Sequence, residues 1–573
     1  MSYLNRGCSS ILLYDYPNVR HGPYIEILAV CLLGQSMTTE VVHRAGSGVR
    51  ALVRKWESLQ VELHGSYSIQ RFNSMFKYRA STGILRALVV LLAIPLIPLV
   101  CVAVIDAIPM NSPDLGLAGS GTVWMRGVSV GLVNSFTLSW MFCQYVPELK
   151  LSRRTLLSTT IAATAVSHLA VLGLIMMFRY PLPFTLVWMS GPWIATLALS
   201  LKLSRGDFLS KNPAVWQDVR RFSILSVMHT SSGLIITGFN VIFQSVPEEW
   251  QTITALLVPA FKITERNLFC RFLRGKDDLK PELVVFTVEI TNTLFISTSM
   301  QQAASTKTSA VLILIDFVQL LISLCDLSLM LKSVKEITDK MKITPNEIIA
   351  CAFMLSTNYP ELGKETPLVD TVAQSKSDVF RLSTFEKIHA TASQVGRKLT
   401  NTNRVAPTLA EGGNMAVVPS TSRMVPVERN SVGPTANDLE LMERITPRER
   451  QMLLRKALQI LFLTEFLLLN ELMEVLTPMM YMILFYCPNR EFYPLFDGLD
   501  EAAFQKVVRN IVVYGLLELG SFVLLVVIIH RTTHKFPFQQ LAYAVSGSWG
   551  KIECKLAIWL TLLLQSTIPQ LGA

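Results

Sequence analysis

Long apolar runs, separated by short polar stretches, recur along most of this sequence. Each run approaches the roughly 20 mostly apolar residues that an α-helix needs to cross the hydrocarbon core of a bilayer. The predicted fold class is therefore all-α, a polytopic integral membrane helix bundle. We expect about eleven spanning helices, near residues 84–105, 123–146, 155–178, 183–201, 222–246, 250–270, 282–301, 309–331, 457–486, 507–530 and 552–570.

Breaks in this pattern divide the chain into four regions. Residues 1–83 are expected to form a cytoplasmic N-terminal region, and residues 84–331 a first membrane block of about eight spans. Residues 454–573 form a second membrane block of about three spans. Between the blocks, residues 332–453 are rich in Ser, Thr, Asn and Pro. This composition predicts a largely disordered cytoplasmic insert.

Two of the predicted spans depart from the simple pattern. The 250–270 segment has the weakest signal, because Lys262, Glu265 and Arg266 interrupt it. The ninth span is about 30 residues long and exceeds the thickness of the bilayer core at about 1.5 Å per residue. We therefore expect the ninth span to tilt, to kink at Pro478 or to protrude from the bilayer.

The charges of the loops predict the orientation of the chain. Lys and Arg gather before the first span, the next loop carries acidic residues, and the alternation continues. Because Lys and Arg are enriched in cytoplasmic loops, the N-terminus is predicted to be cytoplasmic. An odd number of spans places the C-terminus outside. Without the 250–270 span every later loop would change sides, and the loop charges would no longer match the expected bias. We therefore retain that span. A plasma membrane or endomembrane location is expected.

The composition also indicates that lipid is the solvent. Of the 573 residues, 51% are hydrophobic and 16% are charged, whereas soluble domains have roughly 25% charged residues. The net charge of +10 reflects residues at the ends of apolar runs, so we expect no nucleic acid partner. The nine cysteines include no CxxC pair, so neither a zinc site nor a disulfide framework is predicted.

Several acidic and amide side chains lie inside the apolar runs. An ionisable group at that depth costs at least a few kcal/mol unless it faces protein or water, so it marks a functional or packing site. On the 100° period of a helix these side chains form stripes, which could line a hydrated path, coordinate a cation or relay protons. The candidate intramembrane polar site comprises Glu289, Asn292, Asp316, Asp326, Asn470, Glu471, Glu474 and Glu518.

The same residues also fit a structural role. Buried polar side chains can hold membrane helices together by hydrogen bonds without binding or conducting any substrate. Glu465 shares its span with Glu471 but points elsewhere on the helical period. Lys262 and Arg266 either pair with an intramembrane acid or mark a cytoplasmic helix end. Arg126 lies near the end of a predicted span, where we expect it to snorkel to the interface.

The sequence carries no enzyme motif. It has no HExxH zinc-protease sequence, and Gly547-Ser548-Trp549-Gly550 is not a nucleophile elbow. His168 and His229 lie in apolar runs and are expected to be packing residues with satisfied hydrogen bonds. We therefore predict no catalytic residue, no cofactor and no structural metal.

Several separate stretches resemble a known pattern. These are Tyr67 to Arg71, Pro281 to Phe286 with Glu289 and Asn292, Glu465 to Tyr481, Pro488 to Pro494, Asn510 to Phe522, Gln540 to Ala542, and Lys555 with Trp559. Together they resemble a large family of uncharacterised multi-pass transmembrane proteins of oomycetes, over most of residues 67–572 outside the insert. The family has no assigned activity. The resemblance therefore implies a membrane protein of oomycete origin. It supplies no catalytic or ligand residue for this chain.

Two functions from different classes remain open. The first is a transporter or channel-like protein for a cation, a proton-coupled substrate or a small solute, with the intramembrane acids lining its polar core. The second is a non-transporting membrane scaffold or sensor, whose 332–453 insert recruits cytoplasmic protein partners or is phosphorylated. The lipid bilayer is the expected partner in both. The first predicts that neutralising the acids abolishes flux, and the second that deleting the insert abolishes function.

Overall fold

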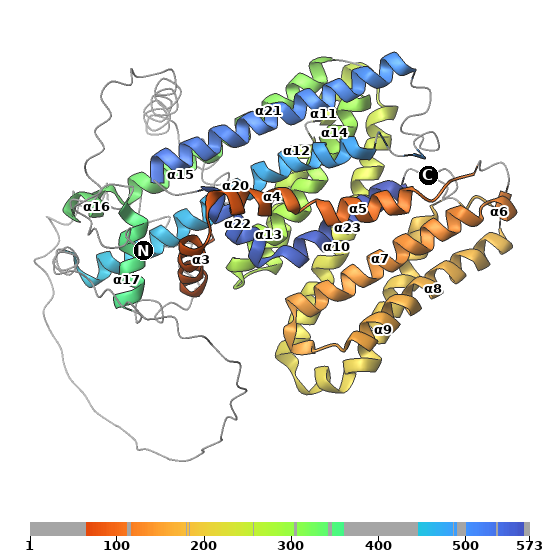
Figure 1. Ribbon diagram of the computed structural model, residues 1–573, viewed down its shortest axis with the longest axis horizontal. Coiled ribbons are helices and arrows are strands. Elements are labelled where there is room, and N and C mark those ends of the chain that lie inside the picture. The colour runs from red at the N-terminus through yellow and green to blue at the C-terminus, as the bar shows by residue number, and fades with distance from the viewer. Residues whose placement is uncertain are drawn as a thin grey trace, which may run out of the picture.

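The computed structural model of the chain describes residues 65–566, apart from residues 112–115, 179, 183, 256, 303–305, 342–346, 360–444, 485, 487, 490–499 and 534–536. Every regular element in this part of the chain is helical (Figure 1). The predicted all-α class is therefore confirmed. The predicted disordered insert falls mainly on residues 360–444, and most of the N-terminal region on residues 1–64, both of which lie outside the described residues.

The helices before the insert form the larger block (Figure 1). Their order is α3 Ile69–Ser81, α4 Ile84–Ala93, α5 Leu96–Asp106, α6 Gly116–Gly119, α7 Gly121–Tyr145, the 3-10 turn η4 Pro147–Leu149, α8 Arg153–Met177, α9 Thr185–Lys211, α10 Pro213–Ser245, α11 Glu248–Ala255, α12 Leu257–Phe272, the 3-10 turn η5 Asp277–Leu279, α13 Lys280–Val284, the π turn η6 Val285–Glu289, α14 Ile290–Gln302, α15 Thr306–Ser333, α16 Lys335–Met341 and α17 Ile348–Asn358.

After the insert, the described residues form the helices α20 Pro447–Leu484, α21 Glu501–Thr533, α22 Pro537–Gly547 and α23 Trp549–Ser566. The start of α20 is fixed by its own sequence. The backbone N–H of Thr446 donates to the Glu449 carboxylate (2.9 Å), and the backbone N–H of Glu449 donates to the Thr446 hydroxyl (3.3 Å). This reciprocal arrangement is a capping box. Pro447 occupies the first helical position, where its missing N–H has no cost.

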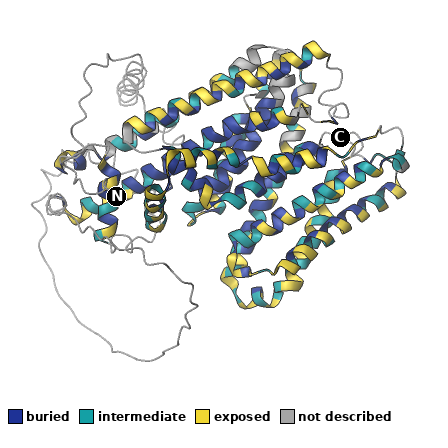
Figure 2. Cartoon of the chain, viewed as in Figure 1, coloured by how far each residue is buried: buried dark blue, intermediate teal, exposed yellow. Residues whose placement is uncertain are grey.

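Helix α20 is the centre of the core. Its apolar residues, among them Leu461, Leu468 and Met473, are fully buried, and it packs against α14, α15, α17, α21 and α22. Figure 2 shows the same central helices as predominantly buried. Because this core continues through most of the length of α20, a polar residue in its middle must face other protein groups.

Four helical stretches within the described residues are long and apolar enough to cross a membrane. They are Ile84–Asp106, which combines α4 and α5, Arg153–Met177, Thr185–Lys211 and Glu501–Arg531. Their outward side chains are apolar, as at Leu85, Leu203 and Leu516, which are all more than half exposed. A continuous apolar exterior of this kind indicates contact with lipid. These helices mark the chain as a membrane protein.

The remaining predicted spans are also helical over their described residues. The 250–270 segment is helical on both sides of residue 256, in α11 and α12, and the first span is divided between α4 and α5 beside Pro95. Pro478 lies inside α20, which is a single helix from Pro447 to Leu484. Helicity is thus established beyond the four candidate spans, while the total of about eleven crossings stays a prediction.

Helices α7, α8 and α9 form a layer of successive neighbours at one end of the molecule (Figure 1). Helix α7 packs on α8, and α8 packs on α9. On its other side α7 packs against α23, the last described helix. The layer is therefore connected to the core through α23.

Candidate carboxylate site

The centre of α20 presents a polar face toward its neighbours. Asn470 and Glu474 are four residues apart, so they lie one above the other on the helix. The Asn470 amide donates to Glu474 Oε1 across 2.9 Å. Glu471 and Glu474 are both buried, at 5% and 4% exposure. The predicted stripe of Asn470, Glu471 and Glu474 is therefore a real feature of the packed helix.

Two cationic side chains of α12 face this stripe. Lys262 Nζ lies 2.7 Å from Glu289 Oε2 and 3.4 Å from Glu474 Oε1. Arg266, one helical turn later, donates from Nε to Glu289 Oε1 (2.9 Å) and from Nη2 to both Glu289 and Asn470 Oδ1, the latter across 2.5 Å. The sequence left open whether these cations pair with an acid or mark a helix end. The structure shows that they pair.

Glu289 is held by the shape of its backbone as well as by these cations. It is the last residue of the π turn Val285–Glu289, in front of α14. Single π turns inside α-helices are rare and are frequent at functional sites. The Glu289 side chain is fully buried. The turn and the two cations together fix its carboxylate between α12 and α20.

Helix α21 adds a third acid to the pair on α20. One carboxylate oxygen from each of Glu471, Glu474 and Glu518 lies within 4.8 Å of the other two. Glu518 is 5% exposed and lies near the middle of the candidate span Glu501–Arg531. Three ionised carboxylates this close repel one another strongly in a medium of low dielectric constant. Protons, a bound cation or a neighbouring ammonium group such as that of Lys262 relieve this repulsion.

The predicted site residues are thus brought together in large part. The exceptions lie on α14 and α15. Asn292 is buried three residues after Glu289, and within the described part of the chain no hydrogen bond joins it to the cluster. Asp316 and Asp326 belong to α15, but their side chains lie outside the described residues.

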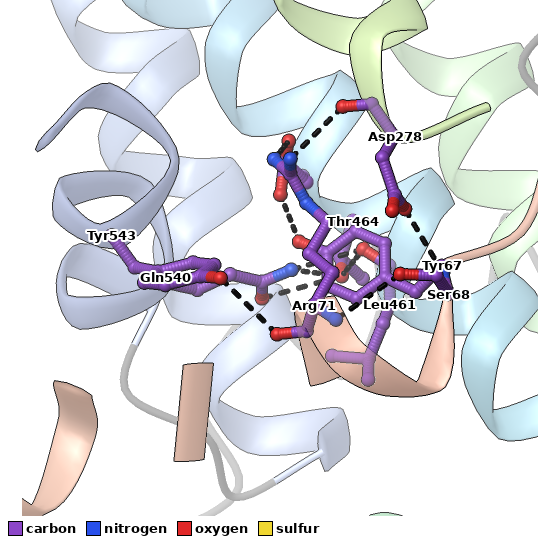
Figure 3. Close-up of polar contacts among 9 residues, drawn as sticks. Tyr67, Ser68, Arg71, Asp278, Leu461, Thr464, Gln540 and Tyr543 are labelled. Atoms are coloured by element: carbon purple, nitrogen blue, oxygen red, sulfur yellow. Dashed lines mark hydrogen bonds and ion pairs between the residues drawn. The ribbon is translucent and has the colours of Figure 1, made fainter. Parts of the chain in front are cut away.

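Glu465 belongs to a separate network, as its position on the helical period predicted. Figure 3 shows other members of this network, among them Tyr67, Arg71 and Tyr543. Arg71 Nη2 lies 2.6 Å from Glu465 Oε1, and the Tyr67 hydroxyl donates to the other oxygen. Arg71 also donates to the Asp278 carbonyl (2.9 Å), and Tyr543 donates to the Arg71 carbonyl (3.2 Å). These contacts join α3 to α20 and α22, and sequence reasoning missed them. They are a packing device in which one acid meets one cation.

Two further buried ion pairs follow the same rule. Lys555 of α23 pairs with Glu282 of α13, which also accepts from the Tyr145 hydroxyl (2.9 Å). Arg126 pairs with Asp106 across 2.6 Å, and both side chains are fully buried. The prediction that Arg126 snorkels to the interface is therefore wrong. Its acidic partner, Asp106, ends the preceding span. An acid at the end of one span and a base near the start of the next is the sequence signal that could have predicted this ion pair.

Comparison of the chain with protein-family models, with curated proteins and with solved structures finds no match. The resemblance to oomycete membrane proteins therefore stays a prediction, and the interpretation of the site rests on its geometry.

Proposed function

We propose that the protein is a transporter or channel-like protein for a cation, and that Glu471, Glu474 and Glu518 bind the cation within the membrane. The observation that supports this best is the approach of three buried carboxylate oxygens to within 4.8 Å of one another. Carboxylate oxygens are the ligands that hard cations such as Ca²⁺, Mg²⁺ and Mn²⁺ prefer. Two adjoining helices, α20 and α21, supply these ligands.

The contrast with three other buried acids supports the proposal. Glu465, Glu282 and Asp106 each have a cationic side chain as partner. A buried acid that serves packing alone is well served by such a match, because an uncompensated charge in the interior is strongly destabilising. In the carboxylate cluster, by contrast, three buried acids lie together. A group of neighbouring carboxylates suits a site that is completed by a mobile positive charge.

Lys262 has a position suited to coupling. Its Nζ reaches Glu289 at 2.7 Å and Glu474 at 3.4 Å. When a cation binds Glu474, the attraction between Glu474 and Lys262 weakens, and Lys262 is left with Glu289. The ammonium group is thus a built-in competitor for the same carboxylate. Such competition favours reversible binding, which transport requires.

The test is cation flux in proteoliposomes, with Mn²⁺ and protons as the two probes. The purified protein is compared with a Glu471→Gln/Glu474→Gln variant and with Glu501→Gln. Glu501 is an exposed acid at the start of α21, so its variant controls for a loss of charge outside the cluster. Folding of all three proteins is matched by thermal unfolding in detergent.

Flux that is present in the wild type and in Glu501→Gln but lost in the double variant would support the proposal. Proton flux without Mn²⁺ flux would assign the cluster to proton relay. Absence of both, with every protein folded, would overturn the proposal. The scaffold or sensor function would then be tested by deleting residues 360–444 of the insert.

We further propose about eleven spans with a cytoplasmic N-terminus, in the plasma membrane or an endomembrane. The alternating loop charges and the helicity of the predicted segments support this topology. A glycosylation sequon placed at residues 112–115, between the first two spans, should then be modified in microsomes. A sequon placed within residues 360–444 should not be. The opposite result at both sites would reverse the orientation.

A further inference from the structure

One buried acid beside the carboxylate site has no cation as partner. Glu265 of α12 lies between Lys262 and Arg266 in the sequence and is 6% exposed. Both of these cations pair with Glu289, and among the described residues none forms an ion pair with Glu265. An uncompensated charge in the interior is strongly destabilising. Glu265 is therefore most stable in its neutral, protonated form.

The hydrogen bonds around Glu265 lead to the same assignment. The hydroxyl of Ser232 on α10 contacts Glu265 Oε1 and lies 2.8 Å from the Met228 carbonyl, one turn earlier on α10. A hydroxyl has one proton to donate, and a carbonyl oxygen only accepts. When Ser232 donates to Met228, a protonated Glu265 donates to the Ser232 oxygen in return. Both contacts are satisfied together only if Glu265 carries a proton.

The second carboxyl oxygen of Glu265 also favours the neutral acid. Oε2 is buried, and no described residue forms a hydrogen bond with it. Burying an oxygen without a donor costs far more free energy for an ionised group than for a neutral one. The two oxygens thus agree on the protonated state.

The elements packed against α12 supply no spare cation to Glu265. They include α10, α11, α13 and η6. Glu289 of η6 is near enough to repel an ionised Glu265, and the acids of α11, Glu248 and Glu249, lie in its first turn. The other titratable groups on this side have partners of their own: His229 of α10 lies 3.2 Å from the Thr287 hydroxyl, Lys280 of α13 pairs with Asp277, and Glu282 of α13 pairs with Lys555.

We propose that Glu265 is a proton-binding site, and that its proton leaves to water when a divalent cation enters the carboxylate cluster. Lys262 connects the two sites. It lies three residues before Glu265, and side chains at this spacing are neighbours on a helix. An ionised Glu265 attracts the ammonium group that otherwise serves Glu289 and Glu474. Glu474 is then released for the cation, while Lys262 compensates the charge of Glu265.

The coupling rests on the proposed cation site, and it names the proton as the ion that moves in exchange. The proton site has its own evidence, which is the hydrogen-bonding and burial of Glu265. The two parts therefore need separate measurements.

Infrared difference spectroscopy of the purified full chain in detergent measures the proton directly. At neutral pH the wild type should show the C=O stretching band of a protonated carboxylic acid that Glu265→Gln lacks. Glu501→Gln, which changes an exposed acid, should keep the band. Ser232→Ala should shift its frequency, because a hydrogen-bond partner is lost. Glu265→Gln should stay folded in thermal unfolding, since the amide is neutral and has nearly the shape of the protonated acid.

The binding of Mn²⁺ measures the coupling. Adding Mn²⁺ should weaken the Glu265 band of the wild type. Release of one proton per bound cation strengthens Mn²⁺ binding by about tenfold for each unit of rising pH, in the range where the cation-free protein keeps that proton. Isothermal titration calorimetry should therefore find a shallower pH dependence of the Kd in Glu265→Gln. The acids of the cluster are present in both proteins, so the difference between the slopes isolates Glu265.

Two results would overturn the proposal: identical C=O regions in the wild type and Glu265→Gln, or equal pH dependence of Mn²⁺ binding in the two proteins. If Mn²⁺ does not bind the wild type at all, the proposed cation site fails and the coupling fails with it. The infrared band then still decides whether Glu265 binds a proton, so the failures of the two proposals are distinguishable.

Discussion

Lys262 Nζ lies 2.7 Å from Glu289 Oε2, and both side chains are almost completely shielded from solvent. The pair connects α12 to the π turn in front of α14. Glu474 lies within 3.4 Å of the same ammonium group, so one cation of α12 serves acids from two different elements. The stability of the core and the charge of the carboxylate cluster therefore depend on the same residue.

Replacing Lys262 with Met should destabilise the protein by about 3–5 kcal/mol, because a buried carboxylate then loses one of its compensating charges. Unfolding in detergent, followed by circular dichroism, measures the loss. The Lys262→Met/Glu289→Gln double variant should recover part of it, since the uncompensated charge is removed as well. A single variant within about 0.5 kcal/mol of the wild type, the range of ordinary surface substitutions, would contradict the assigned role.

Glu518→Gln should remove the stabilisation that divalent cations give. A ligand that binds only the folded state at 100 times its Kd stabilises it by about 2.7 kcal/mol. The wild type and Glu501→Gln should show this gain with Mn²⁺, and Glu518→Gln should show much less. Without Mn²⁺, Glu518→Gln should be at least as stable as the wild type, because repulsion among the carboxylates is relieved. An equal gain in all three proteins would place the Mn²⁺ site elsewhere.

Arg126→Met should cost about 3–5 kcal/mol, because Asp106 would remain buried without its partner. Arg86 provides the matched control, since it is exposed on α4. Arg86→Met should fall within about 0.5 kcal/mol of the wild type, as exposed substitutions usually do. Chemical denaturation of the two variants side by side distinguishes the buried pair from a snorkelling side chain. Equal effects of the two substitutions would restore the snorkelling interpretation.

The start of α20 should respond to acid. The hydrogen bond from Lys340 and those from Thr446 lower the pKa of Glu449 from 4.5 to about 2. Because the pKa is lower in the folded state, Glu449 contributes stability above about pH 4.5, and this contribution is lost as the pH falls toward 2. The pH dependence of unfolding should therefore be shallower in Glu449→Gln over this window. Identical slopes in both proteins would show that the contact with Lys340 has no net effect.

The helices and much of the carboxylate cluster could be predicted from periodicity alone. Asn470, Glu471 and Glu474 form a stripe because their spacing matches the helical turn, and Glu518 recurs in the apolar run that packs beside them. The sequence could not assign partners to these acids. Glu474 and Lys262 are 212 residues apart, and only the packing of α12 on the core brings them together.

Two other features of the sequence carry a weaker signal of helix contacts. Asp106 closes one predicted span and Arg126 opens the next, so successive antiparallel helices would place the two charges side by side. Gly127 and Gly131 repeat at one helical turn, which is the pattern of a close helix contact. Neither observation is decisive in a single sequence, because exposed charges and glycines occur with the same spacings.

The π turn at Val285–Glu289 has one more consequence. Glu282 and Glu289 are seven residues apart, and in an unbroken α-helix two full turns would direct both toward the same neighbour. A π turn holds one additional residue, which shifts the phase of everything after it by about 100°. Glu282 accordingly meets Lys555 of α23, and Glu289 meets Lys262 of α12. The one additional residue of the π turn thus directs two acids of one continuous helical segment toward cations on different helices.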